Sequence, residues 1–493
     1  MTTTPAIPQQ NVNGTHSQKV NAGFRSSKGF IIAVVSIAVF ADVFIYGMVI
    51  PLIPSILRER LAIPAKDLQK WISILLAIFG GAALLGSPIL GFIADKGPSR
   101  KTPFVVSLLA LAVATALFWA AKSPVELVVA RCLQSLSGGA VWIVGNALIL
   151  DTVGKDQAGT AMGYVSMALT VGSLAGPALG GVLLHWAGYD SVFLVAMSLI
   201  CIDIILRALM IEPPKNKASQ GAVSIPDESE PLLRNGNGQP RYDEPAECPT
   251  QSLNQGRERR FTVPPILRLI MSRQLLVVLF ASVIDSVLYN MFEAVLPVFV
   301  IRTFQWSSFG IGMCFFALGL PSLLSPVFGY VVDSYNPRVV STFGFTLLTP
   351  TLIAMRILDN DPSMRAQIML FVFLTIAGFA FSAQLVALMV EVSEPVERLE
   401  RERPGIFGDK GALAQAYALE NMAWATGQLI GPILAAELVQ LAGWSVMVTV
   451  LGAVSAATAV LLAGTSRWAS RVVWKRTGET GSEQSVNHGH GEI

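Results

Sequence analysis

The sequence has little charge and few of the residues that build disulfides, metal sites or nucleophilic active sites. Asp, Glu, Lys and Arg make up 14% of the 493 residues, whereas about 25% is usual in soluble domains. The four cysteines and four histidines are scattered, and no nucleophile elbow or phosphate-binding loop occurs. The net charge of +2 gives no indication of nucleic-acid binding. These absences argue against an enzyme and predict no cofactor and no metal.

What the sequence has instead is a series of long apolar runs, and hydrophobic residues make up 53% of the chain. About 20 apolar residues cross the 30 Å hydrocarbon core of a bilayer. Twelve runs are long enough, in two blocks of six: 30–54, 71–94, 103–121, 125–149, 159–184 and 188–211, then 273–301, 309–332, 338–358, 365–391, 411–440 and 442–464. We therefore predict an all-α membrane protein of twelve transmembrane helices in two six-helix halves, surrounded by lipid bilayer.

Polar segments divide the chain and set its expected orientation. The predicted parts are an N-tail (1–29), a first half (30–211), a linker (212–272), a second half (273–464) and a C-tail (465–493). The linker is rich in Pro, Gly, Asn, Glu and Arg with few aromatics, which predicts disorder. With the N-terminus inside, the inner segments carry 25 Lys and Arg, the outer loops carry 8, and two more lie inside spans. This bias predicts that both termini are cytoplasmic.

A short motif in the linker bears on localisation. Glu228-Ser-Glu-Pro-Leu232-Leu233 fits an acidic dileucine sorting signal, a type of address that coat adaptors read. A chance match in an acidic linker is the alternative. The signal would direct the protein to a vacuolar or vesicular membrane, and without it we expect the plasma membrane.

Two charged residues stand deep inside the apolar runs of the first half. Asp42 lies in the middle of the first run, where an ionised carboxylate costs at least about 2.5–3.5 kcal/mol. We predict that Asp42 is used in function, and a structural carboxylate bonded to a neighbouring helix is the alternative. Arg131 in the fourth run keeps its charge at any working pH. We therefore expect it to pair with a carboxylate or with backbone carbonyl groups.

Spans 6 and 7 add further charged groups. Asp203 and Arg207 are four residues apart and are predicted to pair on one helix. Asp285 and Glu293 are eight residues apart, which places them about 80° from each other around a helix. Both can therefore border one cavity. Two weaker candidates lie in spans 10 and 11: Glu391 and Glu420.

Two motifs occur once in each half, which indicates an internal repeat of the kind that builds many secondary transporters. The first motif reads Gly91-Phe-Ile-Ala-Asp95 followed by Arg100, and Gly329-Tyr-Val-Val-Asp333 followed by Arg338. The second reads Gly172-Ser-Leu-Ala-Gly176-Pro177-Ala-Leu-Gly180-Gly181, and Gly427-Gln-Leu-Ile-Gly431-Pro432. Small residues at four-residue spacing permit close helix contact.

These motifs resemble the major facilitator superfamily, in its twelve-span drug–proton antiporter branch. The segment Ala130-Arg131-Cys132-Leu133-Gln134 is similar to the membrane-embedded arginine motif of that branch, and span 5 carries its glycine–proline motif. The likeness extends to vesicular amine transporters through Asp42, nine residues before Pro51, and through Met291-Phe-Glu293-Ala-Val-Leu-Pro297. The resemblance implies the major facilitator fold and a fungal-type efflux pump for drugs, toxins, secondary metabolites or amines.

The resemblance also implies roles for individual residues. Proton coupling is expected of Asp42, Arg131 and Glu293. Conformational roles are expected of the repeated motifs: Gly91, Asp95, Arg100, Gly172, Gly176, Pro177, Gly180, Gly181, Gly431 and Pro432. Polar and aromatic groups in otherwise apolar helices are typical of small-molecule sites, and the predicted substrate-binding residues are Asp42, Tyr46, Trp142, Asn146, Tyr289, Asn290, Glu293 and Gln384. Each of the single aromatic or polar residues has packing as its alternative role.

The sequence departs from the family pattern at several positions. Gly80 stands near the place of a lysine in span 2 of amine transporters, and Asn421 replaces an aspartate in span 11. Asp42 and Glu293 still favour an organic cation as substrate, and a neutral hydrophobic metabolite is the alternative. We predict a monomeric, proton-coupled exporter of small organic molecules that works by alternating access. The alternatives are an uncoupled facilitator and a transporter-like ligand sensor.

Overall fold

The structure is a computed structural model that describes residues 25–49, 52–53, 56–97, 99–210, 265–306, 308–359, 361–407 and 411–486. Within these ranges the chain is helical and has no strand. Eleven of the described segments are long and apolar enough to cross a membrane. The dileucine motif and most of the expected linker lie outside the described residues. The linker was expected to reach residue 272, but a short helix, α9 (Pro265–Ile270), already begins inside that range.

The first half contributes six long helices, which agree with the six apolar runs. They are α2 (Lys28–Val49), α4 (Ala65–Lys96), α5 (Lys101–Ala120), α6 (Pro124–Val153), α7 (Ala158–Ala187) and α8 (Tyr189–Leu209). Short connections join them, among them a π-helical turn (Ile56–Arg60) and a 3-10 turn, η3 (Lys155–Gln157). Ser123 begins α6 because its hydroxyl accepts the Glu126 backbone N–H at 3.4 Å and Pro124 follows it at the first helical position.

The second half is less regular. Its helices are α10 (Arg273–Phe304), α11 (Ser308–Gly319), α12 (Ser325–Ser334), α13 (Pro337–Ala354), α14 (Met364–Glu391), α15 (Ser393–Glu402) and α16 (Leu413–Val486). The predicted continuous span 309–332 is divided into α11, a 3-10 turn η5 (Leu320–Leu324) and α12. Pro321 and Pro326 explain the division, because proline lacks the N–H that an α-helix needs in its interior.

The long helix α16 holds the last two predicted spans. Gly443 has φ 78° and ψ 177°, a non-helical conformation that separates α16 into two helical segments. Glycine adopts positive φ without the steric cost that a side chain imposes. The predicted boundary, between residues 440 and 442, lies beside this break. Eleven apolar segments with the last one divided are consistent with a twelve-helix bundle.

The glycine–proline motifs bring helices together in the same way in both halves. In the first half, Gly172, Gly176 and Gly180 of α7 lie directly against the backbone of α2. In the second half, Gly427 and Gly431 of α16 lie against α10, around Ser286 and Asn290. A Cβ at most of these glycines would overlap the neighbouring helix, so the small residues permit backbone approach. The repeat found in the sequence is therefore also a repeat in packing.

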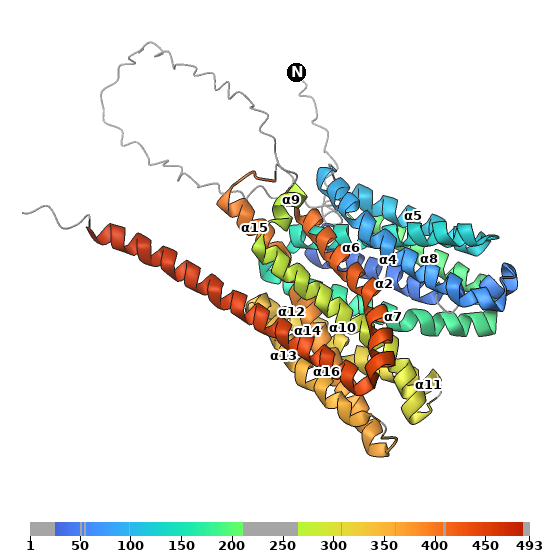
Figure 1. The fold of residues 1–493 in the computed structure, drawn as a ribbon. Helices are drawn as coiled ribbons and strands as arrows, with labels where there is room; N and C mark the ends of the chain where they lie inside the picture. The colour runs from blue at the N-terminus through green and yellow to red at the C-terminus, as the bar shows by residue number, and fades with distance from the viewer. Residues whose placement is uncertain are drawn as a thin grey trace, which may run out of the picture. The chain divides into compact units, whose positions relative to one another are not determined.

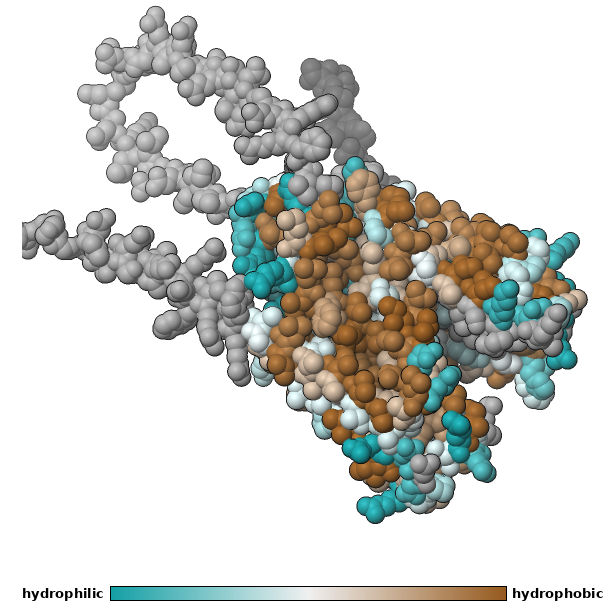
Figure 2. Space-filling view, viewed as in Figure 1, coloured by the Kyte–Doolittle hydropathy of each residue, from teal (hydrophilic) through white to brown (hydrophobic). Residues whose placement is uncertain are grey.

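The helices form one compact unit in which the two halves contact each other through α4 with α16 and through α7 with α12 (Figure 1). The flank of this unit is apolar. Figure 2 shows hydrophobic residues covering the sides of the helices and hydrophilic residues gathered toward their ends. Exposed side chains on this flank include Leu85, Phe280 and Val460. An apolar surface of this extent fits a lipid environment.

Candidate substrate and proton site

The two halves meet where α4 ends and α16 begins, and where α12 ends and α7 begins; we call this the closed end. Asp95, at the end of α4, accepts the backbone N–H groups of Ala414 at 3.1 Å and Gln415 at 2.9 Å. Asp333, at the end of α12, accepts those of Gly159 at 2.6 Å and Thr160 at 2.8 Å. Each carboxylate thus satisfies free N–H groups at the positive N-terminus of a helix from the other half.

Arginines form ion pairs with carboxylates at the closed end in both halves. Arg100 is 3.3 Å from Asp95 and 2.6 Å from Asp151, which lies near the end of α6. In the second half, Arg338 lies 2.5 Å from Glu391. Glu391, which the sequence marked as a weak cavity candidate, is therefore part of an ion pair at the closed end.

The closed end also requires glycine. A Cβ on Gly91 would overlap Ala418 of α16, and one on Gly159 or Gly329 would overlap the backbone of the other glycine's helix. An exposed ion pair adds to the contact, because Lys155 lies 2.6 Å from Glu397 of α15. The glycines and carboxylates of the repeated motif together hold the two halves in contact at this end.

Asp42 belongs to a buried cluster of charges in the first half. Its carboxylate faces Gly138 of α6, where a side chain would collide with it. One carboxylate oxygen is buried without a hydrogen-bond partner among the described residues. Asp203 and Arg207 of α8, which packs against α2, pair at 3.4 Å with both side chains inaccessible, as predicted.

Arg131 is fully buried in α6, and its surroundings differ from the prediction. Its Nη1 donates to Gln134 Oε1 at 2.8 Å. Its guanidinium carbon lies 5.2 Å from the ring centre of Tyr46, 5.1 Å from that of Phe118 and 5.9 Å from that of Phe79. No carboxylate among the described residues forms an ion pair with it, so the expected pairing with a carboxylate or carbonyl was wrong. Aromatic faces stabilise the cation through their quadrupoles instead.

The predicted site residues of the second half lie on α10 and α14. Tyr289 packs edge-on against Phe381 at 5.5 Å, and Glu293, one turn further along α10, is exposed. Asn290 instead donates to the Ser286 carbonyl of its own helix at 2.7 Å. Gln384 of α14 is buried with no partner for its amide atoms among the described residues, and Asn146 of α6 shares this state.

Trp142 forms a contact that the sequence did not predict. Its indole Nε1 donates to Glu420 Oε2 of α16 at 2.8 Å, which joins the two halves inside the membrane-spanning region. Next to it, Asn421 donates to Ser87 Oγ of α4 at 2.8 Å. Glu420 was a weak candidate because it is an intramembrane acid. Its partner could not be inferred, because the pairing depends on how the halves dock.

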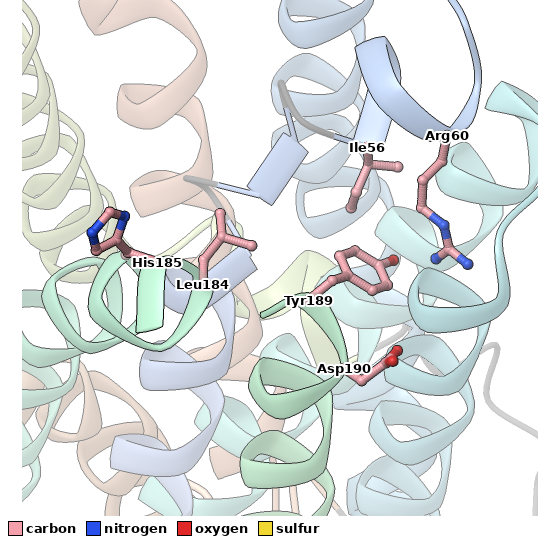
Figure 3. A pocket seen from close by; sticks show the side chains of 7 residues that line it. Ile56, Arg60, Leu184, His185, Tyr189 and Asp190 are labelled. Atoms are coloured by element: carbon pink, nitrogen blue, oxygen red, sulfur yellow. The ribbon is translucent and has the colours of Figure 1, made fainter. Parts of the chain in front are cut away.

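A cavity of about 660 Å³ opens where α7 ends and α8 begins, and Ile56, Arg60, Gly181, Leu184, His185, Tyr189 and Asp190 line it. Figure 3 shows Arg60 beside Tyr189 on one side of the view, with His185 further away on the other. The Arg60 guanidinium lies 4.4 Å from the Tyr189 ring centre and donates to the Trp119 carbonyl at 2.7 Å. Apart from Gly181, none of the predicted site residues lines this cavity.

Comparison with known proteins agrees with the fold and the repeat. The family model described as Major Facilitator Superfamily matches residues 35–401 and 278–483. An MFS-type transporter of Schizosaccharomyces pombe, itself uncharacterized, is 32% identical over 84% of this chain and 90% of its own length. A probable vesicular acetylcholine transporter of Danio rerio is 26% identical over 42% of this chain and 43% of its own. The structure of the human organic anion transporter MFSD10 matches 88% of this chain and 99% of its own with a TM-score of 0.64 at 18% identity.

The described helices form a membrane-spanning bundle with repeated closures between its halves, and the relatives that it matches are named as transporters. The chain belongs to the Major Facilitator Superfamily. It is a multi-pass membrane protein of a transporter family, as the sequence motifs predicted, with a small molecule as the expected class of substrate.

Proposed function

We propose that this protein exports small organic molecules in exchange for protons by alternating access. The observation that carries the proposal is Asp42, an acid inside a membrane-spanning helix with one oxygen unpaired, next to the buried Asp203–Arg207 pair. An intramembrane acid of this kind is costly and marks proton or substrate pathways. The carboxylate faces α6 at Gly138 inside the bundle, and we expect it to exchange a proton for a cationic substrate there.

The contacts at the closed end support the proposal that the protein works by alternating access. Hydrogen bonds and ion pairs join the halves where α4, α7, α12 and α16 meet. These contacts are polar and few, so a modest rearrangement of the halves can break them together. We place the closed end on the cytoplasmic side, with both termini inside, following the distribution of Lys and Arg.

The proposed substrate-binding residues are Asp42, Tyr46, Trp142, Asn146, Tyr289, Asn290, Glu293 and Gln384. The unpaired amides of Asn146 and Gln384 support this set, because buried polar atoms without partners are uncommon and are candidates to bind a ligand. Asp42 and Glu293 favour a cationic amine. We propose that Asp42, Arg131 and Glu293 couple binding to proton exchange.

The test uses purified protein in vesicles with an acidic interior. An organic amine such as a fluorescent cationic dye should accumulate inside, and a protonophore should abolish the accumulation. Asp42→Asn should remove proton-driven accumulation, whereas the matched control Asp67→Asn, at the start of α4, should retain it. Dye entry that survives the protonophore and stops at equal concentrations on the two sides would support the facilitator, and dye binding without any movement would support the sensor.

A further inference from the structure

Glu420 is the acid that physically joins the two halves. It lies on α16 with 2% of its surface exposed, where α16 packs against α4, α6 and α10. Its Oε2 accepts the Trp142 indole N–H at 2.8 Å. This contact must separate whenever the closed end opens, because Trp142 and Glu420 belong to different halves.

No cation among the described residues forms an ion pair with Glu420. The groups that face it are the Trp142 indole from α6, the Asn421–Ser87 hydrogen bond on the α4 side, the acid Asp285 from α10 and Tyr417 on its own helix. Among the described residues, no lysine or arginine forms an ion pair with Glu420 or Asp285. An ionised Glu420 therefore depends on the Trp142 N–H, and two neighbouring carboxylates in an apolar setting disfavour double ionisation.

A line of titratable groups along α10 leads to this acid. Glu293, Tyr289 and Asp285 are each one helical turn apart and so lie on one side of α10. Glu293 is exposed, whereas Asp285 is 2% exposed with one oxygen unpaired among the described residues. The helix α10, which carries these groups, packs against α16, which carries Glu420. The groups thus lie in a row on the helix beside Glu420, from an accessible acid to a buried one.

We propose that Glu420 is a proton-operated clasp between the halves. When ionised, it accepts the Trp142 N–H and holds the closed end shut. When the Glu420 carboxylate takes up a proton that enters from the accessible Glu293 side of α10, Glu420 becomes a neutral acid and its hydrogen bond with Trp142 weakens. The inference rests on the proposed proton-coupled function and adds the device that links the proton to the conformational change.

The physical basis is the difference between charged and neutral hydrogen bonds. A bond to a carboxylate is roughly twice as strong as one to a neutral acid. Protonation also removes the cost of leaving Glu420 charged and unpaired after Trp142 departs. Low pH should therefore favour separation of the halves at the closed end, which is the direction that an exporter needs when it exchanges an outside proton for an inside substrate.

The experiment measures conformation without transport. Spin labels are attached to cysteines at Lys155 and Glu397, which lie in opposite halves at the closed end, in a full-length chain whose native cysteines are replaced by serine. Labelling is done at one pH, and dipolar broadening is then recorded at pH 7.5 and pH 5.5. The otherwise unaltered chain should show close labels at pH 7.5 and about a fivefold larger separated fraction at pH 5.5.

Glu420→Gln should show the larger separated fraction at both pH values, because glutamine is permanently neutral. Trp142→Phe should also lose the pH response. Glu437→Gln, the same substitution at an exposed position of α16, should respond as the unaltered chain does and serves as the matched control. A pH response that persists in Glu420→Gln would overturn the clasp. Loss of proton-driven accumulation with the clasp intact would instead count against the proposed function alone.

Discussion

Among the described residues, the two arginines with no accessible surface, Arg131 and Arg207, belong to the first half. The second half has acids in the corresponding region, Asp285, Glu293 and Glu420, and among the described residues none of these three is in an ion pair. The halves share their packing and their closures, so the fold repeat is retained, whereas the fully buried cations lie in the first half. The first half thus combines the acid Asp42 with buried cations, and the intramembrane acids of the second half have no cationic partner among the described residues.

Breaking the buried pair of the first half should have the largest effect. Arg207→Met leaves Asp203 buried without its cation, which should cost about 3–5 kcal/mol of stability. The double variant Asp203→Leu with Arg207→Met should lose much less, because no lone charge remains. Thermal unfolding of the purified protein in detergent measures both. Equal losses in the single and double variants would contradict the charge-based explanation.

Substitution of a glycine at the closed end should have the next largest effect. Gly91→Val places a side chain against Ala418 and Ala414, and overpacking of this kind typically costs about 1–3 kcal/mol. Because the overlap exists only when the halves meet, the cost should appear as opening of the closed end, read from labels at Lys155 and Glu397. Gly181→Val, where the added carbon meets nothing within 4 Å, should leave the equilibrium unchanged. A similar opening in both variants would show that Gly91 has no special place in the closure.

Asp95 and Asp333 accept hydrogen bonds across the closed end. Their substitutions should have equal effects if the repeat is functional. Asp95→Asn and Asp333→Asn each weaken hydrogen bonds from a charged acceptor to helix N–H groups, worth about 1.5–3 kcal/mol. Each should open the closed end, and Asp95→Asn should also release Arg100 from one of its two partners. Labelling of engineered cysteines by a membrane-impermeant reagent measures the opening. A strong effect of one aspartate with none from the other would show that a single closure suffices.

Substitution of Arg131 should have the smallest effect. Arg131→Lys keeps the charge but loses the planar guanidinium that lies among Tyr46, Phe79 and Phe118. The loss should be about 0.5–2 kcal/mol in stability, seen as a modest fall in the unfolding temperature. Tyr46→Leu should lower it by a similar amount, and the two changes together should not add fully because they remove one contact. Full additivity would indicate that the ring and the cation act separately.

The sequence predicted the fold well because apolar runs and repeated motifs are local signals. The spans, the break near Gly443, the Asp203–Arg207 pair and the close packing at Gly176 follow from spacing along single helices. The contacts of Arg131 with Tyr46, of Trp142 with Glu420 and of Asp95 with Ala414 did not follow, because each joins two different helices. The hydrogen bond from the Asn290 amide to the Ser286 carbonyl lies within one helix and was not predicted either. Contacts across helices depend on docking, which periodicity does not encode.

The central claim is that substrate and protons move in opposite directions through one site. The most direct measurement records both in the same vesicles, with a pH-sensitive dye trapped inside and a cationic amine added outside. The amine should enter acid-loaded vesicles while the interior becomes more alkaline, and Asp42→Asn should stop both signals together. Amine entry with no change in internal pH beyond that of protein-free vesicles would contradict the claim.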